Sequence, residues 1–280
     1  MTVLDKIVKL IRDTSSSLPE DVEKTLKCQL RKEKSAGNSA AVLNLSTILD
    51  NVSLARREGT PLCQDTGTLT FFIDVSLRRK VTAEIVKRAV AIATERGYLR
   101  KNTIESVSGK SCDDNCAEGA PVIHYVEGEG RNQVTLLMKG GGSENMSRQY
   151  SLPDESLGAG RDMAGVRKCI LDAVVKTQGY GCAPGILGVC VGGDRATGFE
   201  VAKLQLLRPL DSAANSRKEL AALEKRILKE ANSLGIGPMG LGGKTTLLGV
   251  KIAERTRVPA SFFVTVAYLC WAARRRTVEL

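Results

Sequence analysis

Four neighbouring residues in the string PLCQDTGT carry side chains that can do chemistry. Cys63 can ligate a metal, and Asp65 can transfer a proton. Gln64 and Thr66 can hydrogen-bond a substrate. A glycine and the apolar run LTFFIDV follow, so these residues are expected on a turn that leads into a buried strand. Asp65 also has an ordinary interpretation, because a turn aspartate commonly accepts a hydrogen bond from the N–H two residues on.

The chain has eight cysteines, and their sequence surroundings separate them. Cys63 and Cys182 lie in turns with Gly and Pro, where a thiol can face a cavity and ligate a metal. Spacing alone leaves open whether these two share a metal. Cys112 and Cys116 resemble half a metal site, but no second pair follows at zinc-ribbon or ferredoxin spacing, so the pair is interpreted as incidental. Three others lie in apolar patterns that predict core thiols, namely Cys28, Cys169 and Cys190.

Two glycine-rich loops could bind an anion. The loop KGGGSEN follows a predicted strand, and its glycines leave backbone N–H groups unshielded. The sequence does not decide between an anion-binding nest and a mobile turn. The second loop, GIGPMGLGGKTT, fails as a P-loop because Pro238 stands five residues before Gly243 and a helix precedes the loop. It is interpreted as a structural turn.

Composition indicates an ordinary globular protein. With 280 residues, 42% apolar and 26% charged, the chain can bury a sizeable core. The longest uncharged stretch is too short to span a bilayer, so no membrane contact is expected. The net charge of +10 attracts anions, but only 4% of the residues are aromatic, which argues against nucleic-acid binding. Eight cysteines in a cytosolic-looking chain of this size do not suggest a disulfide scaffold, because reducing compartments keep thiols free, so some could be metal ligands.

The elements that must position these groups are predicted as helices first and then alternating strands and helices. Residues 1–58 are expected to be helical, and residues 59–280 to form the α/β catalytic part with mixed sheets and packed helices. Strands are predicted over LTFFIDV, APVIHYV, QVTLLMK and ASFFVTVAYLCWAARRR. Later helices are predicted over VTAEIVKRAVAIATERG, MAGVRKCILDAVVKTQG and SAANSRKELAALEKRILKEANSLG. No repeat or linker appears, so residues 1–280 are expected to form a single domain.

The chain resembles the N-terminal half of class I fumarases and the α subunits of two-subunit fumarate and L-tartrate dehydratases. Five motifs in the same order carry the resemblance: PLCQDTGT, KGGGSEN, GYGCAPGILGVCVGG, LGIGPMGLGGKTT and CWAARR. It implies a class I fumarase N-terminal-type domain and an oxygen-sensitive 4Fe-4S cluster on Cys63, Cys182 and Cys270. Three thiolates leave one iron of a cubane without a protein ligand, which suits a Lewis acid that binds a 2-hydroxy acid.

The resemblance also implies roles for other side chains. Asp65 is expected to manage the proton on the departing oxygen, while Gln64 and Thr66 orient the substrate. Arg100 in GYLRKN matches the family's substrate-binding arginine, and a guanidinium suits a carboxylate. The substrate's other carboxylate is assigned to two glycines of the KGGGSEN loop, Gly141 and Gly142.

The predicted function is a cytoplasmic hydro-lyase α subunit that reversibly dehydrates a four-carbon 2-hydroxy dicarboxylate, with fumarate/malate as the first substrate and L-tartrate as the second. The family usually has a histidine where this chain has Val258, in RVPAS, which leaves turnover and substrate identity open. The motifs cover the α half only, so a separate β subunit is expected, in an α2β2-type assembly. The alternative is a basic binding protein with a structural or redox cluster and no dehydratase activity.

Overall fold

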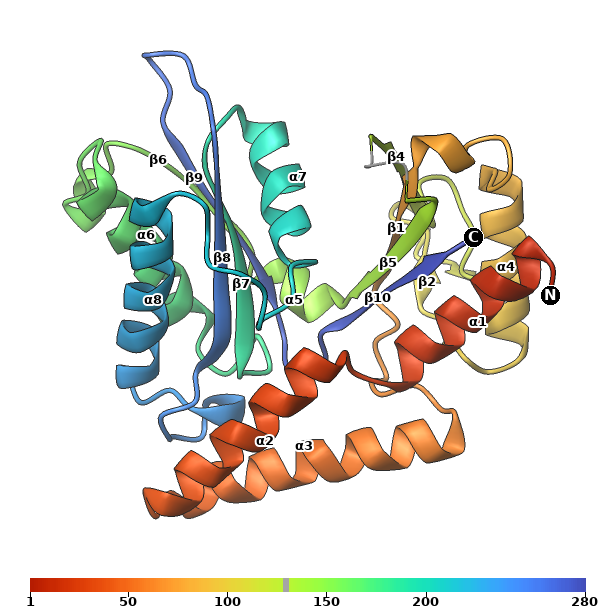
Figure 1. The fold of residues 1–280 in the computed structure, drawn as a ribbon, viewed down its shortest axis with the longest axis horizontal. Helices are drawn as coiled ribbons and strands as arrows, with labels where there is room; N and C mark the ends of the chain where they lie inside the picture. The colour runs from red at the N-terminus through yellow and green to blue at the C-terminus, as the bar shows by residue number, and fades with distance from the viewer. Residues whose placement is uncertain (128–130) are drawn as a thin grey trace. The chain divides into compact units, whose positions relative to one another are not determined.

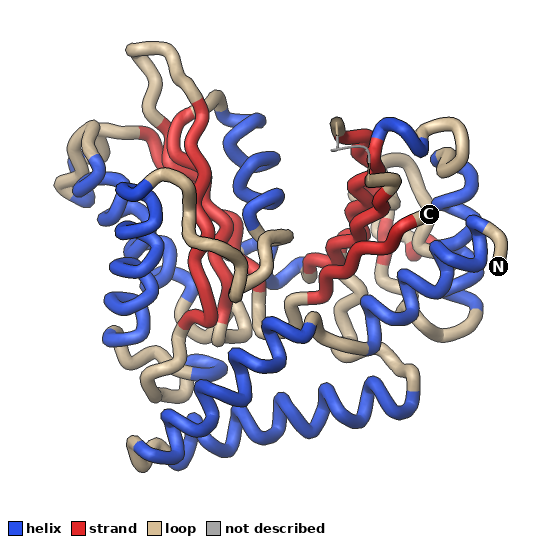
Figure 2. Tube along the Cα trace, in the orientation of Figure 1, coloured by secondary structure: helices blue, strands red, loops and turns tan. Residues whose placement is uncertain are grey.

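The computed structural model describes residues 1–127 and 131–280, which group into two compact units. Unit 1 combines Met1–Pro19, Asp50–Gly141 and Ala272–Leu280, and unit 2 combines Glu20–Leu49 and Gly142–Trp271. Each unit has a four-stranded sheet with packed helices (Figure 1, Figure 2). The predicted α/β class is confirmed, whereas the single domain over residues 1–280 stays a prediction. Among the described residues, no helix has the length and hydrophobicity of a transmembrane span.

The first 58 residues form three helices, as predicted. These are α1 (Val3–Ser16), α2 (Glu20–Ser35) and α3 (Ser39–Glu58). α1 begins with a capping box, in which Thr2 Oγ1 accepts the Asp5 N–H at 3.1 Å and the Asp5 carboxylate accepts the Thr2 N–H at 2.9 Å. These reciprocal bonds satisfy donors that a helix leaves open at its start.

Unit 1 is built on a sheet with the strand order β10-β5-β1-β4. β1 (Thr68–Asp74) pairs parallel with β4 (Val122–Val126) and antiparallel with β5 (Gln133–Lys139), and β5 pairs antiparallel with β10 (Arg274–Glu279). α1 and α4 (Ala83–Glu95) bury their apolar residues with every second residue of β1 and β5. Each large aliphatic side chain buried there stabilises the fold by about 1.5–3 kcal/mol.

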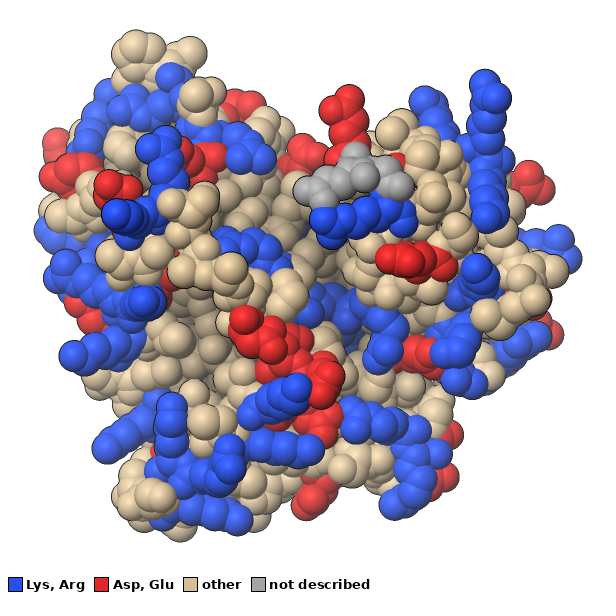
Figure 3. Space-filling view, in the orientation of Figure 1, with Lys and Arg blue, Asp and Glu red and all other residues tan. Residues whose placement is uncertain are grey.

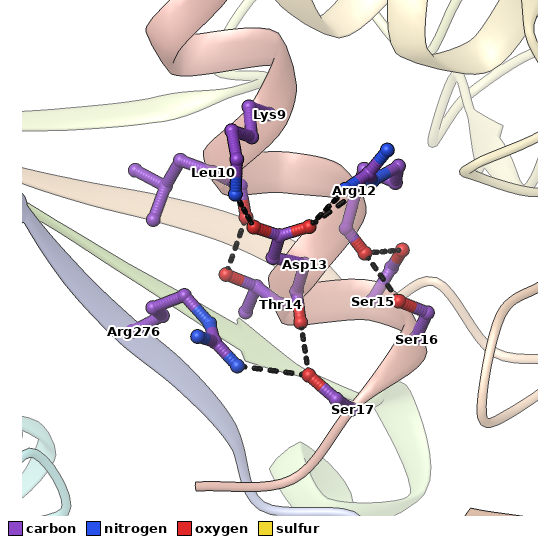
Figure 4. A network of polar contacts seen from close by, with 9 residues as sticks. All are labelled: Lys9, Leu10, Arg12, Asp13, Thr14, Ser15, Ser16, Ser17 and Arg276. Carbon is purple, nitrogen blue, oxygen red and sulfur yellow. Dashed lines mark hydrogen bonds and ion pairs between the residues drawn. The ribbon is translucent and has the colours of Figure 1, made fainter. Parts of the chain in front are cut away.

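The end of α1 is tied to β10 by side-chain hydrogen bonds (Figure 4). Arg276 Nη2 donates to Ser17 Oγ at 2.8 Å, and Ser17 Oγ donates to the Asp13 carbonyl oxygen at 2.5 Å. The Asp13 carboxylate pairs with Lys9 and Arg12. Burial raises the pKa of Asp13, but the hydrogen bonds from Lys9 and Arg12 outweigh it, so that the pKa lies below its usual value. These contacts hold the last strand against the first helix.

Unit 2 has the strand order β6-β9-β7-β8, with helices on both faces (Figure 1). β7 pairs parallel with β8 and antiparallel with β9, and β9 pairs antiparallel with β6. α7 covers one face, and α6 and α8 cover the other. The bounds are β6 (Arg148–Ser151), α6 (Met163–Thr177), β7 (Gly185–Gly192), α7 (Arg195–Gln205), α8 (Lys218–Ser233), β8 (Leu247–Arg255) and β9 (Phe263–Leu269). The short elements are η1 (Val75–Leu77), β2 (Thr103–Ile104), β3 (Ser111–Cys112), α5 (Gly141–Asn145), η2 (Glu155–Leu157) and η3 (Pro238–Gly240).

The closing segment differs from its prediction. One strand was expected over ASFFVTVAYLCWAARRR, but β9 ends at Leu269 and β10 begins at Arg274 in a different sheet. No element was predicted for β6, β7, β8 or α7. β7 is buried along its whole length and contains several glycines, so its sequence has no alternation that marks a strand.

The GGKTT loop is fixed by a buried carboxylate. Glu33, which is 1% exposed, accepts the Lys244 N–H at 2.8 Å, Thr245 Oγ1 at 2.5 Å and Asn38 Nδ2 at 2.5 Å. Burial raises the pKa of Glu33, but these hydrogen bonds bring it below its usual value. The contacts support the interpretation of this loop as a structural turn.

Candidate active site

Asp65, in unit 1, is held by three separate segments of the chain. Its Oδ1 accepts the Gly67 N–H at 2.8 Å and Asn102 Nδ2 at 3.1 Å, and its Oδ2 accepts the Gly141 N–H at 2.7 Å. The carboxylate also lies against Gly140, where an added Cβ would stand 2.7 Å from Oδ2. The turn hydrogen bond of the ordinary interpretation is therefore present, together with two long-range bonds that a simple turn does not need.

Gly67 is expected to tolerate no side chain. Its φ is +74°, and an added Cβ would stand 2.5 Å from the carbonyl carbon and oxygen of Lys139. Gly67→Ala should therefore lower the free energy of unfolding by about 2 kcal/mol or more, as measured by denaturant titration. Gly109→Ala is the matched control, because Gly109 has a φ of +69° with no atom within 4 Å of the added Cβ. An equal loss in both variants would contradict the close approach at Gly67.

Thr66 acts on the backbone of Arg100. The Thr66 side chain is 1% exposed, and its Oγ1 donates to the Arg100 carbonyl oxygen at 2.9 Å and accepts the Arg100 N–H at 2.9 Å. The Arg100 side chain is exposed. Within the part of the chain that the structure describes, it makes no ion pair or hydrogen bond. Gln64 is exposed as well. The geometry supports a role for Thr66 in positioning Arg100, while direct substrate contacts of Gln64 and Thr66 stay predictions.

A cavity of about 830 Å³ in unit 1 borders Asp65 and Gly141. This volume suits a small molecule. The rest of its lining comes from residues 67–69, 102–107, 112 and 115–121. Glu105 and Glu118 in this lining would repel a dicarboxylate, so the cavity does not by itself identify the substrate.

In unit 2, the structure brings two of the three predicted ligand cysteines into one hydrogen-bonded network. Cys182 is exposed with a φ of +51°, and its carbonyl oxygen accepts the Trp271 N–H at 3.3 Å. The Cys270 N–H donates to Ser143 Oγ at 3.1 Å. The motifs GYGCAPG, KGGGSEN and CWAARR are therefore linked through Cys182, Ser143 and Cys270.

Tyr268 lies beside Cys182 and Cys270 and was not singled out from the sequence. Its ring packs against the two glycines that flank Cys182, where an added Cβ would stand 2.5 Å from the ring at Gly181 and 2.3 Å from it at Gly185. Burial raises the pKa of the Tyr268 phenol, and the neighbouring Cys270 and Cys182 raise it further. The glycine spacing in GYGCAPG was the available signal, because glycine is required where another group approaches the backbone closely.

The chemistry of the cysteines separates candidate ligands from core thiols. Burial raises the pKa of Cys169 to about 12 and that of Cys190 to about 11, which keeps both protonated, whereas the thiolate is the form that binds metals. The predicted ligands are less buried, and Cys63 Sγ accepts the Asp65 N–H at 3.4 Å. Among the described residues, no group of three His, Cys, Asp or Glu side chains gathers around one point. As donors, thiols of this kind fit an iron–sulfur cluster.

Arg274 is a second residue that the sequence analysis missed, because AARRR reads as surface charge. Its side chain is 1% exposed, and its Nε and Nη1 have no hydrogen-bond partner among the described residues. Arg274 Nη2 and Asp65 Oδ2 both lie within 4 Å of the point where a Cβ on Gly140 would stand. A buried cation therefore lies near the candidate catalytic carboxylate.

The comparisons with known proteins define the class and then the family. A family model described as fumarate hydratase (Fumerase) matches residues 4–279. The match is to a class of hydro-lyases, the enzymes that add or remove water. The chain belongs to the fumarate hydratase family, which confirms the resemblance seen in the sequence.

Several relatives are similar to this chain over nearly its whole length. The chain is 46% identical to a protein named putative fumarate hydratase class I from Geobacillus stearothermophilus, a match that covers 99% of this chain and 54% of the relative. It is 33% identical to a putative L(+)-tartrate dehydratase subunit alpha from Methanocaldococcus jannaschii, with 98% and 96% covered. It is 31% identical to the L(+)-tartrate dehydratase subunit alpha of Escherichia coli strain K12, with 94% and 86% covered. The chain thus spans about half the length of the first relative and most of the two α subunits.

Proposed function

We propose that this chain is the α part of a hydro-lyase that reversibly dehydrates a four-carbon 2-hydroxy dicarboxylate, fumarate/malate first and L-tartrate second. The observation that carries the proposal is that the Asp65 carboxylate accepts hydrogen bonds from Gly67, Asn102 and Gly141. Asp65 follows directly after Cys63 and Gln64 in the sequence. Two of the family motifs, PLCQDTGT and KGGGSEN, supply most of these contacts. A group held this firmly is suited to proton transfer at a defined place.

Three cysteines, Cys63, Cys182 and Cys270, are proposed to hold a 4Fe-4S cluster. When bound, the cluster would supply a Lewis acid at an iron that has no protein ligand. The support within this chain is the chemistry of the thiols and the network of Cys182, Ser143 and Cys270. Since Cys63 accepts the Asp65 N–H, the proposed ligand and the proposed acid–base group belong to one turn.

The protein's own side chains have distinct proposed tasks. Arg100 binds one substrate carboxylate with its guanidinium, and Thr66 holds the backbone of that arginine. Asp65 manages the proton on the departing oxygen through its carboxylate. The Gly141 N–H already donates to Asp65, so a glycine contact to the second carboxylate would depend on Gly142, which is exposed.

The positive charge of the chain is consistent with an anionic substrate. The net charge is +10, and Lys and Arg side chains are distributed widely over the face drawn in Figure 3 rather than gathered in one patch. Such a field can steer a dianion towards the protein at low ionic strength.

A separate β subunit is proposed as the partner, in an α2β2-type cytoplasmic assembly. Two of the relatives are named as α subunits, and the chain covers most of each. The β subunit would supply the remaining substrate-binding groups and the group that abstracts the C–H proton.

We expect the purified chain alone to be inactive and coexpression with its β subunit to give dehydratase activity. The measurement is anaerobic hydration of fumarate and dehydration of L-malate and L-tartrate, with the β subunit alone as the control. Robust fumarate hydration by the α chain alone would refute the need for a partner.

The second candidate is a basic binding protein with a structural or redox cluster. It is favoured by Val258, which is 64% exposed and stands where the family usually has a histidine. An anaerobic assembly with an intact, air-sensitive cluster absorbance and no activity on any of the three substrates would favour this candidate over the hydro-lyase.

A further inference from the structure

The segment SCDDNC, interpreted from the sequence as incidental, contains a buried amide at the centre of a hydrogen-bond network. Asn115 is 0% exposed and has a φ of +59°, a conformation that asparagine adopts more readily than most residues. Its Oδ1 accepts the N–H groups of Asn102 and Thr103, both at 3.1 Å. Its Nδ2 donates to Thr94 Oγ1 at 3.0 Å and to the Arg100 carbonyl oxygen at 2.9 Å. Both ends of the amide are therefore fully used.

Three of these four bonds hold the segment that carries Arg100 and Asn102. Arg100, the proposed carboxylate-binding residue, is held by Asn115 through its carbonyl oxygen and by Thr66 through its N–H and its carbonyl oxygen. Asn102 is held through its N–H, and its side chain donates to Asp65 Oδ1 at 3.1 Å. The Asn115 side chain thus holds both the backbone of Arg100 and the backbone of Asn102, whose side chain donates to Asp65.

The other end of the amide anchors this arrangement to the core. Thr94, the acceptor of Nδ2, is 6% exposed near the end of α4, and its own hydroxyl donates to the Val90 carbonyl oxygen at 2.9 Å. Val90 belongs to the apolar core of unit 1. A side chain locked in this way can hold an exposed segment to within a fraction of an ångström.

We propose that Asn115 is a positioning residue that sets where Arg100 and Asp65 stand relative to each other. This inference rests on the proposed function, because it assigns Arg100 to a substrate carboxylate and Asp65 to the proton. In this proposal Asn115 acts through the backbone of Arg100 and through Asn102.

Two substitutions compare the loss of the donor end of the Asn115 amide with the loss of the whole side chain. In Asn115→Asp, the Oδ1 atom still accepts from Asn102 and Thr103, but a carboxylate oxygen replaces Nδ2 opposite the Arg100 carbonyl oxygen. In Asn115→Gly, the positive φ is retained without strain and all four side-chain bonds are lost. Asn232→Asp is the matched control in unit 2, because Asn232 Oδ1 accepts two backbone N–H groups, those of Thr246 and Leu247, at 2.9 and 2.8 Å.

The experiment uses the assembly of this chain with its β subunit, prepared anaerobically, with L-malate as the probe. Asn115→Asp is expected to raise the KM for L-malate at least tenfold with kcat per iron little changed. Asn115→Gly is expected to raise KM, to lower kcat at least tenfold, and to speed amide hydrogen exchange at Asn102 and Thr103. Asn232→Asp is expected to lower the melting temperature without changing KM or kcat.

Some outcomes would overturn the inference. Faster exchange at Asn102 and Thr103 in Asn115→Gly with unchanged KM and kcat means that the network is structural only. A KM rise shared equally by Asn232→Asp means that general loosening is the cause. Failure of the wild-type assembly to turn over fumarate, L-malate or L-tartrate counts against the proposed function. In that case the inference is tested by the dissociation constant of L-malate, measured by calorimetry. The inference is overturned if this constant is unchanged in both Asn115 variants. It is also overturned if the wild type does not bind L-malate.

Discussion

Replacing Cys270 by serine is expected to remove the iron from the anaerobically purified protein, and Cys63→Ser and Cys182→Ser are expected to do the same. Ligands brought together by a fold act as a set, because a cubane that loses one of three thiolates is no longer held at that corner. The structure predicts that the fold survives in Cys270→Ser, since the contact to Ser143 Oγ uses the backbone N–H of Cys270. The measurements are iron per chain, the cluster absorbance and the circular dichroism spectrum.

Cys112→Ser and Cys116→Ser are the matched controls for this loss of iron. Both thiols are partly buried like those of Cys63 and Cys270, but they lie in the segment that carries Asn115. Both variants are expected to keep their iron. Full iron content in Cys270→Ser would contradict the ligand assignment.

Asp65→Asn is expected to retain iron and to lower turnover by roughly 10²-fold or more, the usual scale for a lost acid–base group. Binding of the dicarboxylate should weaken little, because Arg100 carries much of that contact. The structure adds a cost in stability, since the carboxylate accepts three N–H donors and an amide presents one oxygen only. One donor would then face an NH₂ group, which costs about 1–3 kcal/mol. Iron content, kcat and the unfolding midpoint are measured on one anaerobic preparation.

Asp74→Asn is the matched control for Asp65→Asn. Asp74 is buried in the same unit and accepts the Ser76 N–H at 2.9 Å and Ser76 Oγ at 2.7 Å. This variant should lose stability and keep its kcat per iron. A normal kcat per iron in Asp65→Asn would mean that Asp65 only stabilises its turn.

The sequence predicted most of the elements and the segments that carry the candidate site. The N-terminal helices, β1, α4, β4, β5, α6 and α8 follow the hydrophobic periods of their own residues, so local patterns were enough. β8 and α7 were not predicted, and β10 was joined to β9, because strand breaks and sheet partners depend on contacts between distant segments.

For the candidate site, the sequence motifs selected the segments, but they could not predict how the side chains of those segments are arranged. Asp65 was selected from its neighbours, yet its bond to Gly141 joins residues 76 positions apart. The contact of Thr66 with the substrate stays a prediction, and the structure adds hydrogen bonds from its hydroxyl to the backbone of Arg100 that the sequence did not predict. Asn115 and Arg274 were missed because a buried amide and a buried guanidinium have the same local sequence signal as exposed ones.

The packing of Tyr268 against Gly181 and Gly185 makes these three positions interdependent in evolution and in protein engineering. A methyl group at either glycine would overlap the ring, so no single substitution there is compatible with the present packing. For Gly185, a smaller residue at position 268 would have to come first, and it would leave a void until the glycine gained a side chain. For Gly181, Thr177 would have to change as well, because its Cγ2 stands 2.6 Å from the added Cβ. In any redesign of the loop that presents Cys182, the residues that pack against its glycines must therefore be replaced before the glycines themselves.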